Sequence, residues 1–216
     1  IIRTFWRNAK GRDLQPPMNE PGYWNFYEWS HGLSDGFSSN LRNKNDYRNF
    51  DGPLSIFYIL ALDAMIKTAK LLYSHTKTVT DTNGNLYEVD FVEKISWCEL
   101  LLKGAKNAFH DTFWDSEVGA YCSYVVNAEK LHFSELMNSL ALYAGLVPDK
   151  YIKRVADILS EKEVCSPALI KITLSHAIFK YEALLNAGED YTDYVICDIA
   201  DKWGNMLLCG ATSFWE

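Results

Sequence analysis

The chain has 216 residues, of which 48% are hydrophobic and 23% charged, and its formal net charge is −7. This apolar content is too high for a disordered chain, and 12 glycines with 6 prolines exclude a collagen-like or linker-dominated protein. The acidic balance and the lack of a basic cluster argue against nucleic-acid binding. Since no apolar stretch approaches the roughly 18 to 20 residues that span a bilayer, we expect one packed domain or a piece of a larger one.

Cysteine and histidine residues give no sign of a metal or redox site. The five cysteines and five histidines stand at irregular spacings that match neither a metal knuckle nor a redox pair. We therefore expect most cysteines to be small core residues and predict no metal site.

The first quarter of the sequence differs in pattern from the rest. Residues 1–53 are aromatic and polar, and a run rich in Asn, Asp, Ser and Gly covers residues 38–52. This composition predicts a long ordered loop region. From Leu54 onward, apolar residues recur at steps of three and four, which predicts a helix over 54–74.

Turn-forming residues separate the next elements. Asn83-Gly84 lies between two short β-prone runs and predicts a hairpin, because both residues of such a turn take positive φ. A helix is predicted over 91–111 from its apolar stripe. Gly119 then predicts a turn, followed by a short strand over 120–126.

Helical periodicity continues to the end of the chain. Four further helices are predicted over 133–144, 149–160, 167–187 and 189–203. Ser134 and Ser166-Pro167 are typical of helix N-termini, and Pro148 suits a first helical turn. Gly145 and Gly204 are typical of helix C-termini.

The six predicted helices group into three αα-hairpins. Each hairpin joins two helices that are consecutive in the sequence: 54–74 with 91–111, 133–144 with 149–160, and 167–187 with 189–203. The fold class is therefore all-α, with one or two small β-hairpin excursions. Stacked hairpins of this kind form either a curved solenoid piece or half of a six-hairpin toroid.

Two segments carry candidate binding or catalytic residues. Gly210-Ala211-Thr212-Ser213-Phe214-Trp215-Glu216 ends in a carboxylate beside an indole, which could tune the pKa of Glu216 by desolvation; the alternative is an ordinary coil with an exposed Glu. Upstream, Trp24 and Trp29 belong to a cluster of aromatic residues that is either a set of core plugs or a platform for sugar rings. His31 and His132 could bind sugar hydroxyls or be structural.

Three motifs resemble the bacterial α-L-rhamnosidase family of glycoside hydrolases. The segment 210–216 is similar to the family signature GATTxWE. Trp114-Asp115 with Gly119-Ala120-Tyr121, followed by 132–148, resembles the run WDxxxGLY…HSNALALxLGLVP. Tyr27-Glu28-Trp29 resembles a DW element, with Glu in place of the more frequent Asp.

The resemblance implies a domain architecture and a reaction. It implies that residues 1–216 are one domain, the later part of an (α/α)6 catalytic barrel that hydrolyses terminal α-L-rhamnosides with inversion and no cofactor. Glu216 would be the general base, and Glu28, Trp24, Trp29 and Trp215 would line the sugar site.

The general acid of the family lies in an upstream Asp-Glu motif that has no match in residues 1–15. Because the chain also begins without Met, we expect a fragment that is inactive alone, with the rest of its catalytic domain as partner. No membrane partner is expected. The family occurs in bacteria both inside and outside the cell, so the compartment stays open.

Two other interpretations remain. Another (α/α)6 glycosidase or a glycoside phosphorylase would share the fold, and a phosphorylase needs a basic phosphate pocket, for which the sequence offers only Arg154 after Arg48. A non-catalytic helical-hairpin binding module would instead expose a hydrophobic face.

Overall fold

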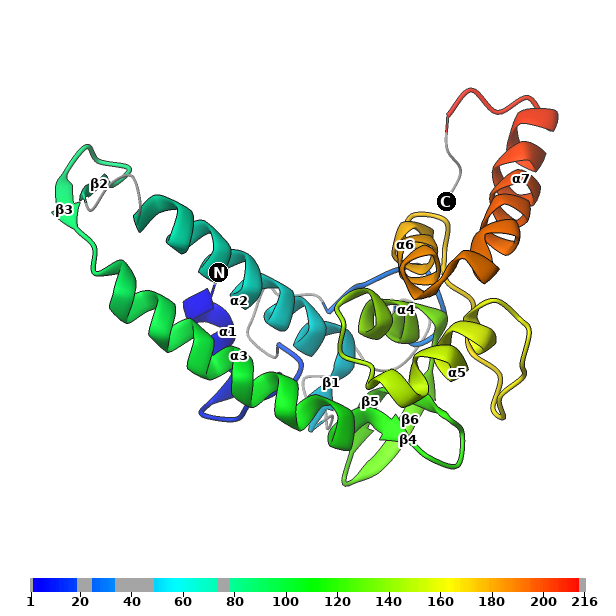
Figure 1. Ribbon diagram of the computed structural model, residues 1–216, viewed down its shortest axis with the longest axis horizontal. Helices are drawn as coiled ribbons and strands as arrows, with labels where there is room; N and C mark the ends of the chain where they lie inside the picture. Colours follow the sequence, from blue (N-terminus) through cyan, green and yellow to red (C-terminus); the bar gives the residue numbers. More distant parts are fainter. Residues whose placement is uncertain (1, 19–24, 34–48, 74–77, 214–216) are drawn as a thin grey trace.

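The computed structural model describes residues 2–18, 25–33, 49–73 and 78–213 (Figure 1). Of the described residues 56% are helical, and these ranges hold seven α-helices and two small antiparallel sheets. The helices are α1 (Ile2–Ala9), α2 (Gly52–Tyr73), α3 (Phe91–Phe113), α4 (Glu135–Tyr143), α5 (Asp149–Leu159), α6 (Ala177–Ala187) and α7 (Thr192–Leu208). The strands are β1 (Phe50–Asp51), β2 (Thr78–Thr80), β3 (Leu86–Glu88), β4 (Trp114–Asp115), β5 (Ala120–Val126) and β6 (Glu129–Phe133).

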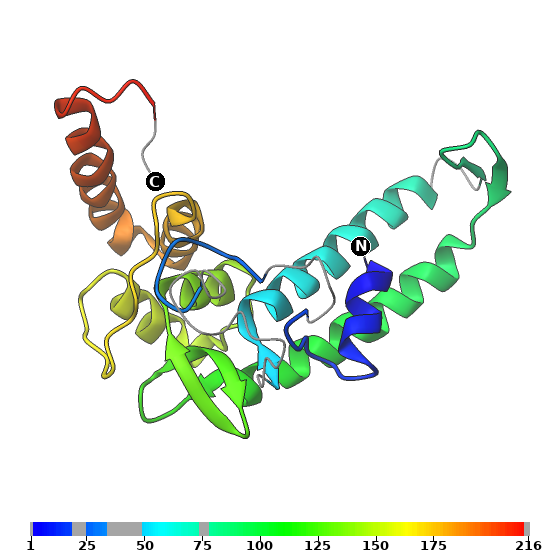
Figure 2. The same cartoon turned by 180° about the vertical axis from the view of Figure 1, so that it is seen from behind.

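Helices α2 and α3 form a long antiparallel hairpin that projects from the rest of the molecule (Figure 1). The short strands β2 and β3 close its far end, and Gly84 takes φ +85° in their turn, as the Asn83-Gly84 pattern predicts. Helix α1 lies across this hairpin, where Phe5 stacks 5.5 Å from Tyr58 (Figure 2).

Helix α1 corrects the expectation that residues 1–53 form only loop. Its eight residues do follow a helical period: Ala9 is buried, and Phe5 and Ile2, four and seven positions before it, pack against the core. The expectation was wrong because this apolar run is only about two turns long, and so short a helix depends on packing against its neighbour α2.

A four-stranded sheet lies between the base of α3 and the last helices. β5 is its centre: it pairs antiparallel with β1, β4 and β6, and six of its seven residues are buried. The strand predicted over 120–126 is therefore confirmed. The pairing joins Phe50 to Val125 and Cys122 to Phe133, so residues far apart in sequence meet at this sheet.

The remaining helices pack around α4. The Ser134 hydroxyl caps α4 by accepting a hydrogen bond from the Met137 amide at 3.1 Å, as predicted. α4 contacts both α5 and α6, whereas α7 leans outward from α6 (Figure 1). The three expected helix pairs are each in contact.

Three helix boundaries differ from the predictions. α6 begins at Ala177 instead of residue 167, and Ser166-Pro167 is a cis peptide in a non-helical segment. This segment is extended because Ile170 pairs with the chain around Ser134: the Ile170 amide donates to Phe133 O at 2.9 Å. Pro148 is the N-cap of α5. α7 continues through Gly204 to Leu208, and Gly210, with φ +80°, follows its end.

The buried core is one cluster that runs through the α2–α3 hairpin, the sheet and α4 to α7. Cys98, Cys122 and Cys165 are buried and Cys197 and Cys209 are exposed, all with free thiols, so three of the five are core residues as expected. Among the described helices, none has the length and apolarity that a membrane span requires.

Candidate functional site

The candidate site is built around Glu28, a carboxylate in a tight loop. The loop closes through a hydrogen bond from the Tyr27 amide to Leu33 O at 2.9 Å and one from the Leu33 amide to Ser30 O at 3.1 Å. Glu28 is 1% exposed, while the neighbouring Trp29 is 47% exposed. The loop therefore buries the carboxylate and presents the indole to solvent.

Glu28 is held by the segment that precedes α6. Its Oε2 accepts hydrogen bonds from the amide and the hydroxyl of Thr173, each at 2.8 Å, and its Oε1 accepts one from the Ser30 hydroxyl at 3.0 Å. The Thr173 hydroxyl lies 2.9 Å from that of Ser175, which lies 3.3 Å from His176 Nδ1. The side chains of Ser30, Glu28, Thr173, Ser175 and His176 thus form one continuous series of polar contacts.

The environment of Glu28 shifts its proton affinity. Burial raises the pKa of Glu28 above its ordinary value of 4.5, although the hydrogen bonds from Thr173 and Ser30 and the charge of His176 act in the opposite direction. The carboxyl group is also held in one orientation by its three donors.

The β5–β6 hairpin supports the same loop from its other side. His132 Nε2 lies 2.6 Å from His31 O, and the Tyr124 hydroxyl donates to Gly32 O at 2.8 Å. The imidazoles of His31 and His132 stack with their centroids 6.5 Å apart. In the structure His132 thus contacts the backbone of the Glu28 loop.

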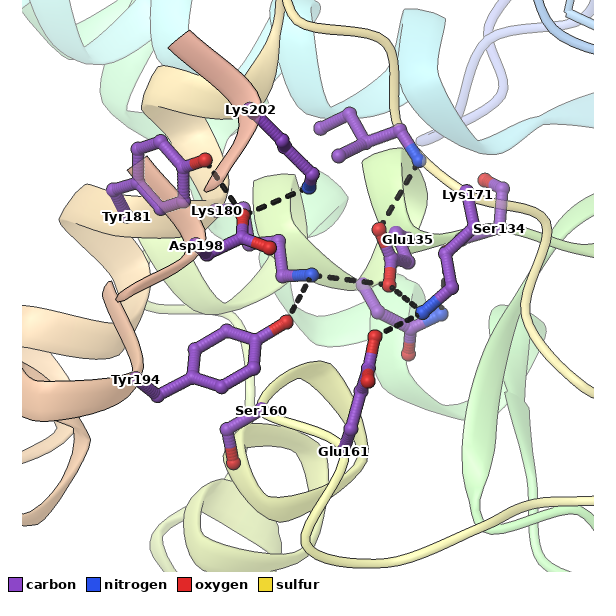
Figure 3. A network of polar contacts seen from close by, with 12 residues as sticks. Ser134, Glu135, Ser160, Glu161, Lys171, Lys180, Tyr181, Tyr194, Asp198 and Lys202 are labelled. Atoms are coloured by element: carbon purple, nitrogen blue, oxygen red, sulfur yellow. Dashed lines mark hydrogen bonds and ion pairs between the residues drawn. The ribbon is translucent and has the colours of Figure 1, made fainter. Parts of the chain in front are cut away.

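A buried ion-pair network fixes the segment that holds Glu28 (Figure 3). Glu135, the first residue of α4, accepts from the ammonium groups of Lys180 and Lys171 at 3.1 Å each, and its second oxygen accepts from the Ile172 amide at 3.1 Å. Lys180 also donates to the Tyr194 hydroxyl at 2.9 Å. Since Ile172 directly precedes Thr173, Glu135 anchors the backbone from which Thr173 reaches Glu28.

The outer part of this network joins α6 to α7. The Tyr181 hydroxyl donates to Asp198 at 2.6 Å, and Lys202 donates to the same oxygen at 2.8 Å (Figure 3). Although burial opposes the shift, these two donors lower the pKa of Asp198. The network therefore connects α4, α6 and α7 through charged and phenolic groups.

Only some of the site residues predicted from the sequence lie in the described part of the chain. Glu28 and Trp29 lie in the loop described above, and the rings of Phe26 and Trp29 meet edge to face with centroids 4.7 Å apart. Trp24, Trp215 and Glu216 lie outside the described residues, so their positions relative to Glu28 stay predictions. In the described part of the chain, no group of three His, Cys, Asp or Glu side chains is placed to hold a metal ion.

Sequence reasoning missed the residues that hold Glu28. Thr173 gave no signal, because its partner lies 145 residues away. Lys180 did give a signal in the sequence. It lies three residues after Ala177 and four before Leu184, on the apolar face of the helix, and a lysine at such a position needs a buried partner. Glu135, beside the cap Ser134, is that partner.

Comparison with known proteins gives structural likeness only. No family model and no curated protein sequence matches the chain. The crystal structure of a GH78 family rhamnosidase of Bacillus sp. GL1 matches with a TM-score of 0.73 and 18% identity, covering 100% of this chain and 19% of the other. A rhamnosidase from Klebsiella oxytoca with rhamnose bound matches with a TM-score of 0.68 and 19% identity, covering 100% and 33%.

The chain has a rhamnosidase-like fold. Both matches cover 100% of this chain, although the chain spans only about one fifth and one third of the two rhamnosidases. A fold related to glycoside hydrolases agrees with the resemblance found in the sequence motifs.

Proposed function

We propose that the chain forms part of a glycoside hydrolase catalytic domain that cleaves terminal α-L-rhamnosides with inversion of configuration. The observation that carries this proposal is the full-length structural match to two rhamnosidases, one of them named as holding rhamnose. Three sequence motifs with the same family resemblance support it independently. The site is formed by the Glu28 loop and the C-terminal segment.

In this proposal some residues carry out the chemistry and others bind the sugar. Glu216 is the general base that activates the attacking water. The general acid is a second carboxyl group, roughly 6.5 to 9.5 Å from the first. The exposed indole of Trp29 stacks on the apolar face of the sugar, with Trp24 and Trp215 beside it. Glu28, buried in the same loop, fixes the backbone that presents this indole.

The proposed partner of this chain is the remainder of its catalytic domain. An apolar groove of about 450 Å³ lies open between α6 and α7, and it is lined by Leu174, Ile178, Tyr181, Ile199 and Trp203. Ile178 is 55% exposed and Ile199 is 41% exposed. Further helical hairpins packed here would bury this surface and extend the stack toward an (α/α)6 toroid.

The test is proton NMR of an aryl α-L-rhamnoside with the 216-residue chain and with the longest gene product that contains it. We expect β-rhamnose as the first-formed anomer from the longer product, and loss of about a thousandfold or more of its activity in Glu216→Gln. Glu182→Gln, at an exposed position of α6, is the matched control. Equal turnover by wild type and Glu216→Gln would remove Glu216 from catalysis.

A helical binding module is the second candidate, because the α6–α7 groove is the kind of exposed apolar face that such a module needs. Absence of turnover by the longer product over a panel of aryl glycosides would favour it. A phosphorylase has less support: Arg154, the cation on which its phosphate pocket would depend, is ion-paired with Glu163.

A further inference from the structure

A polar groove of about 440 Å³ lies between α1 and α3, on elements that do not contribute to the Glu28 site. One wall is Arg3, Trp6 and Arg7, and the other is Glu93, Lys94 and Trp97. On each helix the first and third of these residues are four positions apart and the second lies between them, so all three border the same side of the helix. The volume is in the range of small-molecule sites.

An aromatic side chain from each wall contacts the other across this groove. The rings of Trp6 and Trp97 meet edge to face, with centroids 6.2 Å apart and planes at 68°. Trp6 remains 46% exposed in this arrangement. An indole held by a neighbouring ring and open on one side is a rigid surface for stacking.

The charge of the groove opposes that of the chain. Three cations, Arg3, Arg7 and Lys94, face one carboxylate, Glu93, which lies 3.8 Å from the Lys94 ammonium. Within the described residues, neither guanidinium is ion-paired or hydrogen-bonded to a carboxylate. The chain as a whole has a net charge of −7, so the groove is a local excess of positive charge on an acidic protein.

We propose that this groove binds an anionic saccharide, a sugar chain that carries carboxylates. Guanidinium groups bind a carboxylate through two parallel hydrogen bonds, and the indole of Trp6 stacks on the C–H face of a sugar ring. Arg7 and Trp6 are adjacent on α1, so one uronate residue can contact both. The proposal does not depend on the hydrolase function, because none of its six residues belongs to the Glu28 site.

The probe is tetragalacturonate, titrated into the 216-residue chain by isothermal calorimetry at pH 7 in 50 mM NaCl. We expect saturable 1:1 binding that weakens as salt is raised, because the contacts are charged and exposed. Arg3→Gln and Arg7→Gln should each weaken binding by about tenfold, the effect of losing a charge-assisted contact. Trp6→Ala should weaken it by a similar factor through loss of stacking.

Controls separate this site from general attraction of anions. Lys106→Gln removes an exposed cation of α3 that does not line the groove, and binding should not change. Maltotetraose, which is neutral, should bind at least about tenfold more weakly than tetragalacturonate. Circular dichroism of each variant verifies folding, and the two Arg substitutions alter only solvent-exposed side chains.

Four results would overturn the proposal. These are absence of tetragalacturonate binding, equal binding of maltotetraose, an effect of Lys106→Gln as large as that of Arg7→Gln, and tighter binding of hexaglutamate or adenosine monophosphate than of the uronate. The last result would assign the groove to an acidic peptide or a nucleotide instead.

Discussion

Thr173 donates two hydrogen bonds to the same oxygen of Glu28, from its amide and its hydroxyl, each 2.8 Å long and spanning 145 residues of sequence. One side chain near α6 thereby fixes the loop that presents Trp29. The pair is a long-range contact between two segments that lack regular secondary structure. Its strength therefore decides how well the candidate site is ordered.

Replacement of Thr173 by Val removes the hydroxyl donor and keeps the backbone donor. We expect Thr173→Val to lower the free energy of unfolding by about 1–2 kcal/mol and to raise the pKa of Glu28 further, because a hydrogen bond that favours its charged form is lost. Urea denaturation and carbon NMR of the Glu28 carboxyl group measure the two effects. Thr68→Val, on the exposed side of α2, is the control and should leave the Glu28 pKa unchanged.

The raised pKa of Glu28 predicts a pH dependence of stability. A carboxyl group whose pKa is higher in the folded protein than in the unfolded chain stabilises the fold at low pH, and this contribution is lost as pH rises from about the unfolded value of 4.5 through the folded pKa. Glu28→Gln does not titrate. The free energy of unfolding of wild type relative to Glu28→Gln should therefore decrease as pH rises above 4.5.

Urea denaturation of both proteins between pH 4 and pH 8 measures this difference. A constant difference over the whole range would show that Glu28 has the same pKa in both states. A difference that increases with pH would mean that the hydrogen bonds from Thr173 and Ser30 outweigh burial, so that the pKa is lowered.

The buried ion pair between Glu135 and Lys180 predicts that the two side chains contribute jointly to stability. Both side chains are almost fully buried, so Lys180→Met leaves Glu135 with the exposed Lys171 as its remaining ammonium partner. We expect a loss of about 3 kcal/mol in the free energy of unfolding. Lys171→Met should cost under about 1 kcal/mol, because exposed pairs contribute little.

A double-mutant cycle with Glu135→Gln verifies the pairing. The double variant Glu135→Gln/Lys180→Met should be more stable than Lys180→Met alone, since no uncompensated charge remains. Strict additivity of the two substitutions would contradict the ion pair seen in the structure.

Replacing Gly32 by alanine is predicted to cause a steric clash, whereas the same replacement of Gly84 is not. A Cβ at Gly32 would lie 2.5 Å from the His132 ring, whereas a Cβ at Gly84 meets nothing within 4 Å, and the two residues have φ +78° and +85°. Gly84→Ala should cost about 1 kcal/mol for its backbone conformation. Gly32→Ala should cost about 1–3 kcal/mol more, because the imidazole must move.

Thermal denaturation of the two alanine variants measures the difference. The imidazole signals of His132 should shift in Gly32→Ala and stay in place in Gly84→Ala. Equal losses of stability would show that His132 moves aside without cost.

Several elements of the fold could be predicted from local sequence alone. The apolar stripes of α2 and α3, the Ser134 cap of α4 and the Asn83-Gly84 turn each depend on neighbours within a few positions, and each is found. The largest helix-boundary error has a long-range cause. Residues 167–176 have helical periodicity, yet they pair with Phe133 and Glu135, which lie more than thirty positions away.

What the sequence determined by itself is the helical class, most helix positions and the family resemblance, because periodicity, capping and short motifs are local properties. Only the tertiary structure decided that Glu28 is buried against Thr173, that Lys180 has Glu135 as its partner, and that Arg7 shares a groove with Trp97. These relationships arise from packing between distant segments. Hydrogen bonds and burial across such distances leave no period in the sequence, so they become visible only when the chain is folded.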